Sequence, residues 1–452
     1  MKKIISMIGL GGVLCILLFF FPSCAHTVTT VAGTGSHGAS DYGLGQFNLP
    51  GGVLSGDNGY FYVLDTYNNL IRIVSPEGEI SRLSGNIQMD GDMPILDSFR
   101  FPMGGFKDGP LDEALFNRPT AGVRDALGRI FITDSANHAI RMISMGMVYT
   151  FAGGTGEGHK DGHGAYAQFS YPTALAISPD GSLYIADTGN NAIRRICAAG
   201  YVTTVAGFQS IEVQDIDFQG IEAHDIDFQD SELQDSELLD SELQDSELQD
   251  IYEHNNSTYH SILLNEPMGI AVREDGVIFV ADTGNHVIRI IENGRISTFA
   301  GVYRMPEEIG YETDDETSDE TNEETGNNEW DLHWDLHPIG GFADGPPETA
   351  MFNMPIGLTF WGEILIVADY INHAIRKIHP CGEVETLTGT GYPGHADGCA
   401  NEAMFHLPRG VYIIEDALII ADTGNNMIRK IILNTHSNTI REILAGEENE
   451  ND

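Results

Sequence analysis

The sequence predicts an all-β fold: a six-bladed β-propeller of four-stranded antiparallel blades, interrupted by two disordered acidic loop insertions. Three observations support this prediction. One polar pattern occurs six times, runs with strand character flank each copy, and the 452 residues include 52 glycines but only 18 prolines. Many short strands joined by tight turns have this kind of composition.

The repeated pattern is Asp-x-x-Asn-x-x-Ile-Arg. Successive copies begin 69, 53, 95, 87 and 53 residues apart, so the basic period is 53 residues. Its polar positions are Asp65, Asn68, Arg72, Asp134, Asn137, Arg141, Asp187, Asn190, Arg194, Asp282, Asn285, Arg289, Asp369, Asn372, Arg376, Asp422, Asn425 and Arg429. A catalytic group is needed once, whereas a turn cap or an inter-blade hydrogen bond is needed in every blade. We therefore interpret the pattern as structural, since Asp and Asn bond turn backbone and Arg offers several donors.

The third copy shows how one repeat makes a blade. Apolar or alternating runs at residues 174–178, 183–187, 192–196 and 202–207 are separated by short turns. Four short antiparallel strands form one propeller blade, which buries its faces only against neighbouring blades. A strand ending in a small residue and glycine occurs seven times for six repeats. Either the strand near 28–33 or the one near 440–446 therefore completes the last blade, and the other is an additional edge.

Two copies carry a family resemblance most clearly. Residues 185–194 read Ile-Ala-Asp-Thr-Gly-Asn-Asn-Ala-Ile-Arg and residues 280–289 read Val-Ala-Asp-Thr-Gly-Asn-His-Val-Ile-Arg. These segments resemble NHL repeats, and the resemblance covers nearly all of residues 28–446 outside the acidic tracts. It implies a propeller domain, which we place at residues 27–446. It does not imply one activity, because such repeats occur in lyases, sensor domains, RNA-binding modules and envelope proteins.

Residues 1–25 have the pattern of an export signal. Two lysines precede an apolar run from Ile4 to Phe21, and Pro22-Ser23-Cys24-Ala25 follows. Three outcomes fit this pattern: lipidation of Cys24 as in a bacterial lipoprotein, cleavage after Ala25, or retention as a membrane anchor. Each of them predicts an exported protein in the periplasm or outer cell envelope. Lipidation would tether it by lipid, and any contact with membrane is expected only through this N-terminal anchor.

The net charge of −44 is concentrated in two tracts. Residues 208–253 hold 16 Asp or Glu and residues 305–336 hold 13, with no Lys or Arg in either. We place acidic low-complexity insertions at 208–260 and 303–340, and a short disordered tail at 447–452. A mobile loop is the expected structure, a five-residue β-solenoid being the alternative for the first tract. Such tracts could collect divalent cations or dock a basic partner, and the overall charge excludes nucleic acid as a favoured partner.

Five cysteines do not form a disulfide scaffold in a chain of this length. Cys381 and Cys399 flank one predicted strand. They either pair in an oxidising compartment or remain as two free thiols, and the sequence leaves both outcomes open.

Candidate ligand-binding residues lie at Asp-Gly turns that are accompanied by histidines. They are His159, Asp161, His163, His395 and Asp397. We expect these loops on the face of the disc that carries the Asp-x-x-Asn turns, where loops from every blade converge. A His and Asp pair there could hold a divalent cation or act as acid and base, whereas ordinary turns with solvated histidines explain the same residues.

The sequence therefore favours an exported binding or scaffold module, monomeric and without an evident cofactor. Its expected partner is an envelope protein, a peptide or a glycan on the loop-rich face. The alternative is a metal-dependent lyase or lactonase-like enzyme with its site at the propeller axis. The predicted inner strands contain no His, Asp or Glu, which favours binding over catalysis.

Overall fold

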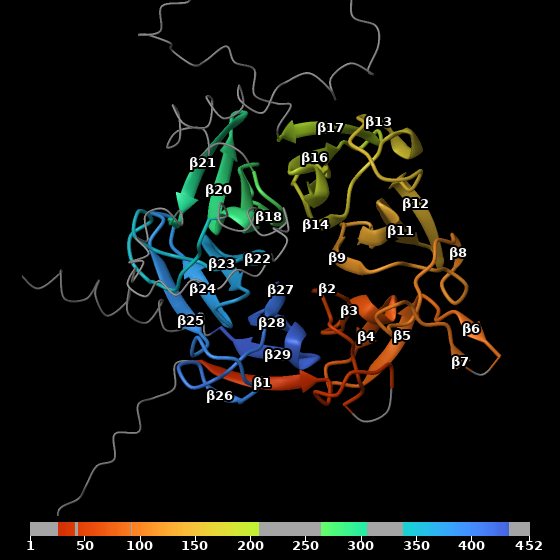
Figure 1. The fold of residues 1–452 in the computed structure, drawn as a ribbon, viewed down its shortest axis with the longest axis horizontal. Helices are drawn as coiled ribbons and strands as arrows, with labels where there is room; N and C mark the ends of the chain where they lie inside the picture. The colour runs from red at the N-terminus through yellow and green to blue at the C-terminus, as the bar shows by residue number, and fades with distance from the viewer. Residues whose placement is uncertain (1–25, 41–43, 92, 208–263, 305–337, 434–452) are drawn as a thin grey trace, which may run out of the picture.

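The computed structural model describes residues 26–40, 44–91, 93–207, 264–304 and 338–433. Six antiparallel sheets are arranged around a central axis, each with one edge strand at the axis (Figure 1). The predicted six-bladed β-propeller is confirmed. The predicted export signal, most of both acidic insertions and the tail lie outside the described residues.

Each blade contains four main strands, which follow one another from the axis to the rim. Blade 1 consists of β2 (Gly52–Ser55), β3 (Phe61–Asp65), β4 (Leu70–Val74) and β5 (Ile80–Ser84). Blade 2 consists of β9 (Pro119–Arg124), β10 (Ile130–Asp134), β11 (Ala139–Ser144) and β12 (Met147–Gly153). Blade 3 consists of β14 (Pro172–Ile177), β15 (Leu183–Asp187), β16 (Ala192–Ile196) and β17 (Tyr201–Ala206).

The second half of the ring follows the same order. Blade 4 consists of β18 (Pro267–Val272), β19 (Ile278–Asp282), β20 (Val287–Glu292) and β21 (Arg295–Ala300). Blade 5 consists of β22 (Pro355–Trp361), β23 (Ile364–Asp369), β24 (Ala374–Ile378) and β25 (Val384–Thr388). Blade 6 consists of β27 (Pro408–Ile414), β28 (Ala417–Asp422), β29 (Met427–Ile432) and β1 (Thr27–Ala32).

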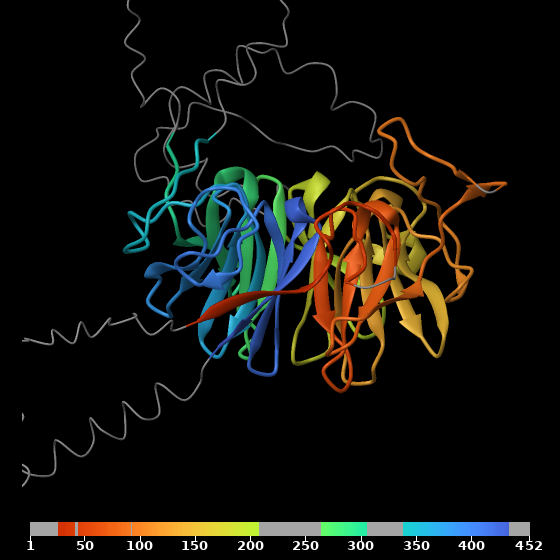
Figure 2. The same ribbon diagram turned by 90° about the horizontal axis from the view of Figure 1, so that it is seen from below.

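Three blades have a short fifth strand at the outer rim, an addition to the four strands predicted. These strands are β8 (Gly109–Pro110) in blade 2, β13 (Gly162–His163) in blade 3 and β26 (Gly398–Cys399) in blade 6. A separate hairpin of β6 (Met89–Asp90) and β7 (Met93–Pro94) projects beyond the disc, as the side view shows (Figure 2).

Strand β1 closes the ring. It pairs with β29 along most of its length, so the sequence near residue 28 supplies the outer main strand of blade 6. Of the two closures open in the sequence, the structure has the first. The segment near 440–446 lies outside the described residues.

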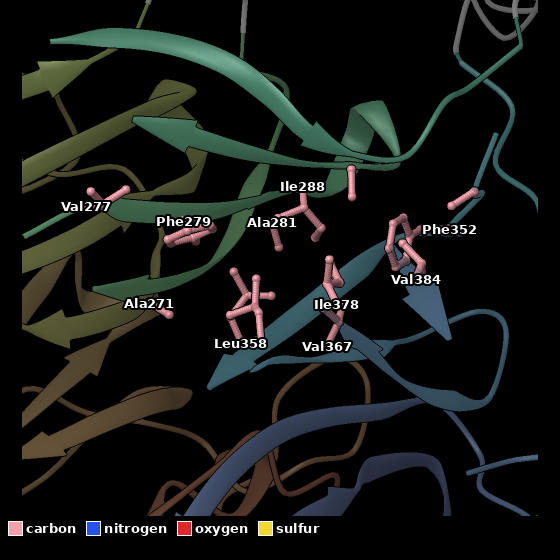
Figure 3. Packing of buried hydrophobic residues seen from close by; sticks show 13 residues of the cluster. Ala271, Val277, Phe279, Ala281, Ile288, Phe352, Leu358, Val367, Ile378 and Val384 are labelled. Carbon is pink, nitrogen blue, oxygen red and sulfur yellow. The ribbon is translucent and has the colours of Figure 1, made fainter. Parts of the chain in front are cut away.

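The core lies between blades rather than within them. Between blades 4 and 5, Phe279 and Ile288 face Leu358 and Val367, and all four side chains are buried (Figure 3). Five further clusters of buried apolar side chains accompany this one. Because each sheet buries its faces only against its neighbours, a single blade would leave most of its apolar surface in water.

The repeated Asp-x-x-Asn-x-x-Ile-Arg pattern forms a buried polar network in each blade. In blade 3, Asp187 accepts hydrogen bonds from the Ser170 amide, from Asn190 and from the Arg194 guanidinium at 2.6 to 2.8 Å. Both Asp187 and Arg194 are buried, and the guanidinium stacks on the Phe169 ring. Buried charges are tolerated when they are paired and hydrogen-bonded, and these contacts fulfil that condition.

Neighbouring blades are joined by two kinds of hydrogen bond, which we call the hydroxyl latch and the amide latch. In the hydroxyl latch, the Ser or Thr after the repeat Asp donates to the carbonyl of the proline that opens the next inner strand. The five donors are Thr66, Ser135, Thr188, Thr283 and Thr423, at 2.6 to 2.8 Å. They begin the 3-10 turns η1 (Thr66–Asn68), η2 (Ser135–Asn137), η4 (Thr188–Asn190), η6 (Thr283–Asn285) and η9 (Thr423–Asn425).

The amide latch occurs at all six joins. The residue after the repeat Asn accepts the amide of the residue before the next proline, through an Asn Oδ1 or a His Nδ1. The acceptors are Asn69, His138, Asn191, His286, His373 and Asn426, at 2.7 to 3.2 Å. A histidine in this position must have an unprotonated Nδ1 in order to accept.

Cys399 is disulfide-bonded, whereas Cys381 and Cys197 are free thiols. The pairing of Cys381 with Cys399 considered from the sequence is therefore wrong. Cys381 lies in the exposed turn between β24 and β25, while Cys399 lies in β26 against β1 on a different blade. The described part of the chain has no helix that is long and apolar enough to cross a membrane.

Candidate functional site

A cavity lies on the propeller axis. It encloses about 460 Å³ and is lined by residues from all six inner strands, β2, β9, β14, β18, β22 and β27. These strands surround the centre of the ring in Figure 1. The wall of the cavity consists mainly of backbone and of aliphatic or hydroxyl side chains. A cavity of this size matches the range in which proteins bind small molecules.

One position of the repeat forms the rim of this cavity. The residue directly after each opening proline lines it, at the end of the inner strand that faces the Asp-x-x-Asn turns. The six residues are Gly51, Thr120, Thr173, Met268, Ile356 and Arg409. Five of these residues are neutral and one is a cation, so Arg409 gives the rim a single charged position.

Arg409 is half-buried and has no salt-bridge or hydrogen-bond partner for its guanidinium within the described chain. Burial lowers its pKa from the ordinary value, while Tyr67 and Tyr370 lie near enough to interact with its charge. The other inner-strand arginine, Arg124, lies at the opposite end of its strand and pairs with Asp57 at 2.8 Å. The lining of the axial cavity thus contains a desolvated cation without a counter-ion.

The backbone around Arg409 is closely packed. A Cβ added to Gly357 on β22 would lie 2.1 Å from the Arg409 carbonyl oxygen. A Cβ added to Gly410 would lie 2.7 Å from the Gly51 carbonyl oxygen on the other side. Only glycine permits these approaches, so β27 is held between two inner strands and the base of the arginine is fixed.

Tyr370 marks a second departure from the repeat at the same join. It occupies the position of the Ser or Thr of the hydroxyl latch, and among the described contacts it makes no hydrogen bond to Pro408, the proline before Arg409. Residues 370–373 also form an ordinary turn in place of the 3-10 turn of the other blades. The join between blades 5 and 6 thus differs from the other five at two facing positions.

The sequence-predicted aspartates lie at the outer rim of the disc. Asp161 pairs with Arg194 at 2.7 Å and accepts bonds from the amide and hydroxyl of Thr204 on β17. Asp397 makes the equivalent contacts with Arg429 and Thr30. Asp108 and Asp344 repeat this arrangement in blades 2 and 5. The structure therefore brings these carboxylates to the buried arginines rather than to the axis.

The predicted histidines are also peripheral. His159 and His395 are exposed, and His163 lies in β13 on the outer circumference, with its ring against Tyr201 (Figure 1). The structure does not bring the blade 3 and blade 6 candidates together. Within the described ranges no group of three or more His, Cys, Asp or Glu is placed to hold a metal ion. The ligand-binding role of these residues remains a prediction.

The candidate residues predicted from the sequence did not include Arg409, Tyr67 or Tyr370. The signal was present: aligning the residues after the six prolines isolates one arginine, and aligning those after the six repeat aspartates isolates one tyrosine. The histidines of the amide latch were likewise not predicted. Burial lowers the pKa of His286 and His373, which favours the neutral ring that accepts a bond.

Fold and repeat together define the class: this is a six-bladed β-propeller with an axial cavity. The family model of the NHL repeat matches residues 169–196, which span the strands and turn of blade 3. The same pattern recurs in all six blades, and the protein is an NHL-repeat β-propeller.

Two relatives illustrate the similarity. The protein SUPPRESSOR OF QUENCHING 1, chloroplastic, of Arabidopsis thaliana is 34% identical over 154 residues, which are 33% of this chain and 14% of that protein. NHL repeat-containing protein 2 of Gallus gallus is 26% identical over 371 residues, 78% of this chain and 44% of that protein. The chain thus spans less than half the length of these relatives.

Among solved structures, an auxiliary nutrient binding protein from Bacteroides thetaiotaomicron has a TM-score of 0.52 and 15% sequence identity. The match covers 90% of this chain and 76% of that one. This likeness shows the fold.

Proposed function

We propose that the protein is a binding module that takes its ligand at the loop-face mouth of the axial cavity. The observation that carries the proposal is the cavity lining: about 460 Å³ surrounded by backbone, aliphatic and hydroxyl groups, with one guanidinium. Such groups recognise a ligand by shape, hydrogen bonds and charge. The expected ligand is a peptide or glycan, or a protruding segment of an envelope protein.

In this proposal, the repeated polar residues stabilise the fold and do not bind the ligand. The Asp, Asn and Arg of each blade are bonded to one another and to turn backbone, and the rim aspartates are bonded to the same arginines. Their carboxylates and most of their donors are bonded within the fold, and the arginine nitrogens that are left over, such as Arg194 Nε, are buried away from the solvent. Recognition is therefore assigned to positions that vary from blade to blade around the mouth of the cavity.

A probe array tests the binding site. The labelled full chain is applied to arrays of glycans and peptides beside two variants. Met268→Trp places a large ring on the cavity rim, and Leu127→Trp adds the same ring at an exposed turn. We expect wild type and Leu127→Trp to share hits that Met268→Trp loses. Hits that persist in Met268→Trp, or no hits at all, would contradict the proposal, and turnover of a lactone by the wild type would favour the enzyme alternative.

We also propose that the propeller acts outside the cytoplasm, in the cell envelope. The support is the signal pattern of residues 1–25, together with the fold likeness to a Bacteroides protein described as nutrient binding. Cell fractionation with radioactive palmitate checks both location and anchoring. Labelled protein in the envelope fraction, with the label lost in Cys24→Ser, is the expected result. Unprocessed protein in the cytoplasm would contradict it.

A further inference from the structure

We infer that Arg409 of blade 6, together with the hydroxyls of Tyr370 in blade 5 and Tyr67 in blade 1, holds an oxyanion, a carboxylate or phosphate group of the ligand. The inference rests on the proposed function, because it assigns chemistry to the mouth of the same cavity. It adds the class of group that the site selects.

Arg409 is an unpaired cation among the described residues. Six other arginines of the described chain, one in each repeat, are buried and bonded to at least one carboxylate. Arg409 has no such carboxylate, although its surroundings desolvate it. An unpaired charge in a poorly solvated position is unfavourable, and an incoming anion removes that cost.

Two departures from the repeat coincide where blade 5 meets blade 6. Tyr370 replaces the latch hydroxyl of blade 5, and Arg409 follows the proline that this hydroxyl would bind. At the other five joins the latch donor is occupied by a proline carbonyl. Here that bond is absent from the described contacts, so the Tyr370 hydroxyl is available to a ligand.

The three side chains have the chemistry that binds an oxyanion. A guanidinium presents parallel N–H donors that match the two oxygens of a carboxylate or phosphate, and phenolic hydroxyls donate to further oxygens. Tyr67 lies in η1 of blade 1 and Tyr370 in the turn of blade 5, so they come from the two blades on either side of blade 6. Arg118 places its guanidinium 5.1 Å from the centre of the Tyr67 ring, which helps to orient that ring.

The test uses the full chain and small probes. Thermal unfolding is measured with D-glucuronate, with D-glucose as its neutral counterpart, and with inorganic phosphate, at constant ionic strength. Ligand binding to the native state raises the melting temperature. We expect glucuronate or phosphate to raise it and glucose not to, and the two anions distinguish a carboxylate from a phosphate site.

Three variants locate the effect. Arg409→Gln is expected to lower the affinity for the effective anion on the order of tenfold to a hundredfold. Tyr370→Phe, which removes only the hydroxyl, is expected to lower it several-fold while leaving the circular dichroism spectrum unchanged. Arg124→Gln, the matched control on another inner strand, is expected to retain the wild-type affinity. Undiminished anion binding by Arg409→Gln, or no stabilisation of the wild type by either anion, would overturn the inference.

The outcome is distinguishable from failure of the proposed function. If Met268→Trp loses the array hits while Arg409→Gln keeps them, the cavity binds a ligand and the oxyanion site is wrong. If neither variant changes the hits, binding occurs elsewhere and the proposed function itself is wrong.

Discussion

Five of the six joins between blades are alike, and the join between blades 5 and 6 is not. Each of the five has a buried hydroxyl that bonds the next proline carbonyl, whereas the sixth has Tyr370 beside an unpaired Arg409. In a ring of repeats, a residue type found at every join is expected to stabilise the ring. A residue that is found at one join only, and that faces the axial cavity, is available to bind a ligand. The comparison predicts that changes at repeated positions cost stability and that changes at the exceptional join alter binding.

The largest expected effect is a loss of stability when a residue of the repeated pattern is replaced. Asp187→Ala removes a buried carboxylate that accepts bonds from Ser170, Asn190 and Arg194. Breaking a buried charge pair by removing one partner should lower the free energy of unfolding by about 3 kcal/mol. Urea denaturation measures the loss, with Asp180→Ala, an exposed carboxylate of the same blade, as control. A loss under about 1 kcal/mol would show that the network is not needed for stability.

The next effect tests one hydroxyl latch. Thr188→Val keeps the shape of a buried side chain but leaves the Pro267 carbonyl without its donor. An unsatisfied buried acceptor should lower the free energy of unfolding by about 2 kcal/mol. The control is Thr203→Val on the outer strand of the same blade. Equal effects of the two changes would contradict the assigned role of the latch.

A smaller effect of opposite sign is expected at the exceptional join. Tyr370→Thr restores the residue type that bonds the next proline at four other joins, so it should form a hydroxyl latch to Pro408. We expect a gain of about 1 kcal/mol in the free energy of unfolding, together with weaker anion binding. Urea denaturation and the thermal-shift titration measure the two quantities. Loss of stability would mean that Tyr370 is itself a structural residue.

The smallest effect is on the pH dependence of the amide latch at this join. Burial and the neighbouring His406 lower the pKa of His373 below its ordinary value of 6.5. As the pH falls below about 6.5, the unfolded chain takes up a proton that the native His373 resists, so stability should decrease slightly. The asparagine acceptors at Asn69, Asn191 and Asn426 have no such titration.

His373→Asn isolates this contribution. The buried Asp65, Asp134 and Asp369 titrate in the opposite sense, because burial raises their pKa to about 6 and the folded state then binds the extra protons. Their contribution is common to both proteins and cancels in the difference between variant and wild type. Denaturation at several pH values should show a smaller loss of the free energy of unfolding at acid pH for His373→Asn than for the wild type. An identical pH dependence of the two proteins would contradict the role given to His373.

The fold was predictable from the sequence because its determinants are repeated. Six copies of one pattern at a fixed minimal period specify the blades, and turn chemistry at each copy specifies the strand order. The identity of the closing strand was not predictable, since β1 and the segment near 440–446 have similar patterns. Hydrogen bonding with β29 decides it, and that pairing joins residues far apart in the chain.

The candidate site was predictable only in part. The sequence placed ligand recognition on the loop-rich face but selected Asp161 and Asp397, whose carboxylates are bonded to arginines at the outer rim. Sequence position does not reveal how far a residue lies from the axis, because one connecting segment, residues 389–407, runs from the outer strand β25 of blade 5 to the inner strand β27 of blade 6. Arg409 is neither a histidine nor a carboxylate, and only its departure from the repeat distinguishes it in the sequence.

Blade 6 brings together strands from the two ends of the described chain. Thr27 lies opposite Cys399, and Val28 lies opposite Ile431. Bringing such distant segments together costs loop-closure entropy, and contacts of this range form late in folding. During folding, β1 therefore stays unpaired until β29 is in place beside it. Until then blade 1 and blade 5 each expose an apolar face. The folding chain is therefore most prone to aggregation just before blade 6 closes the ring.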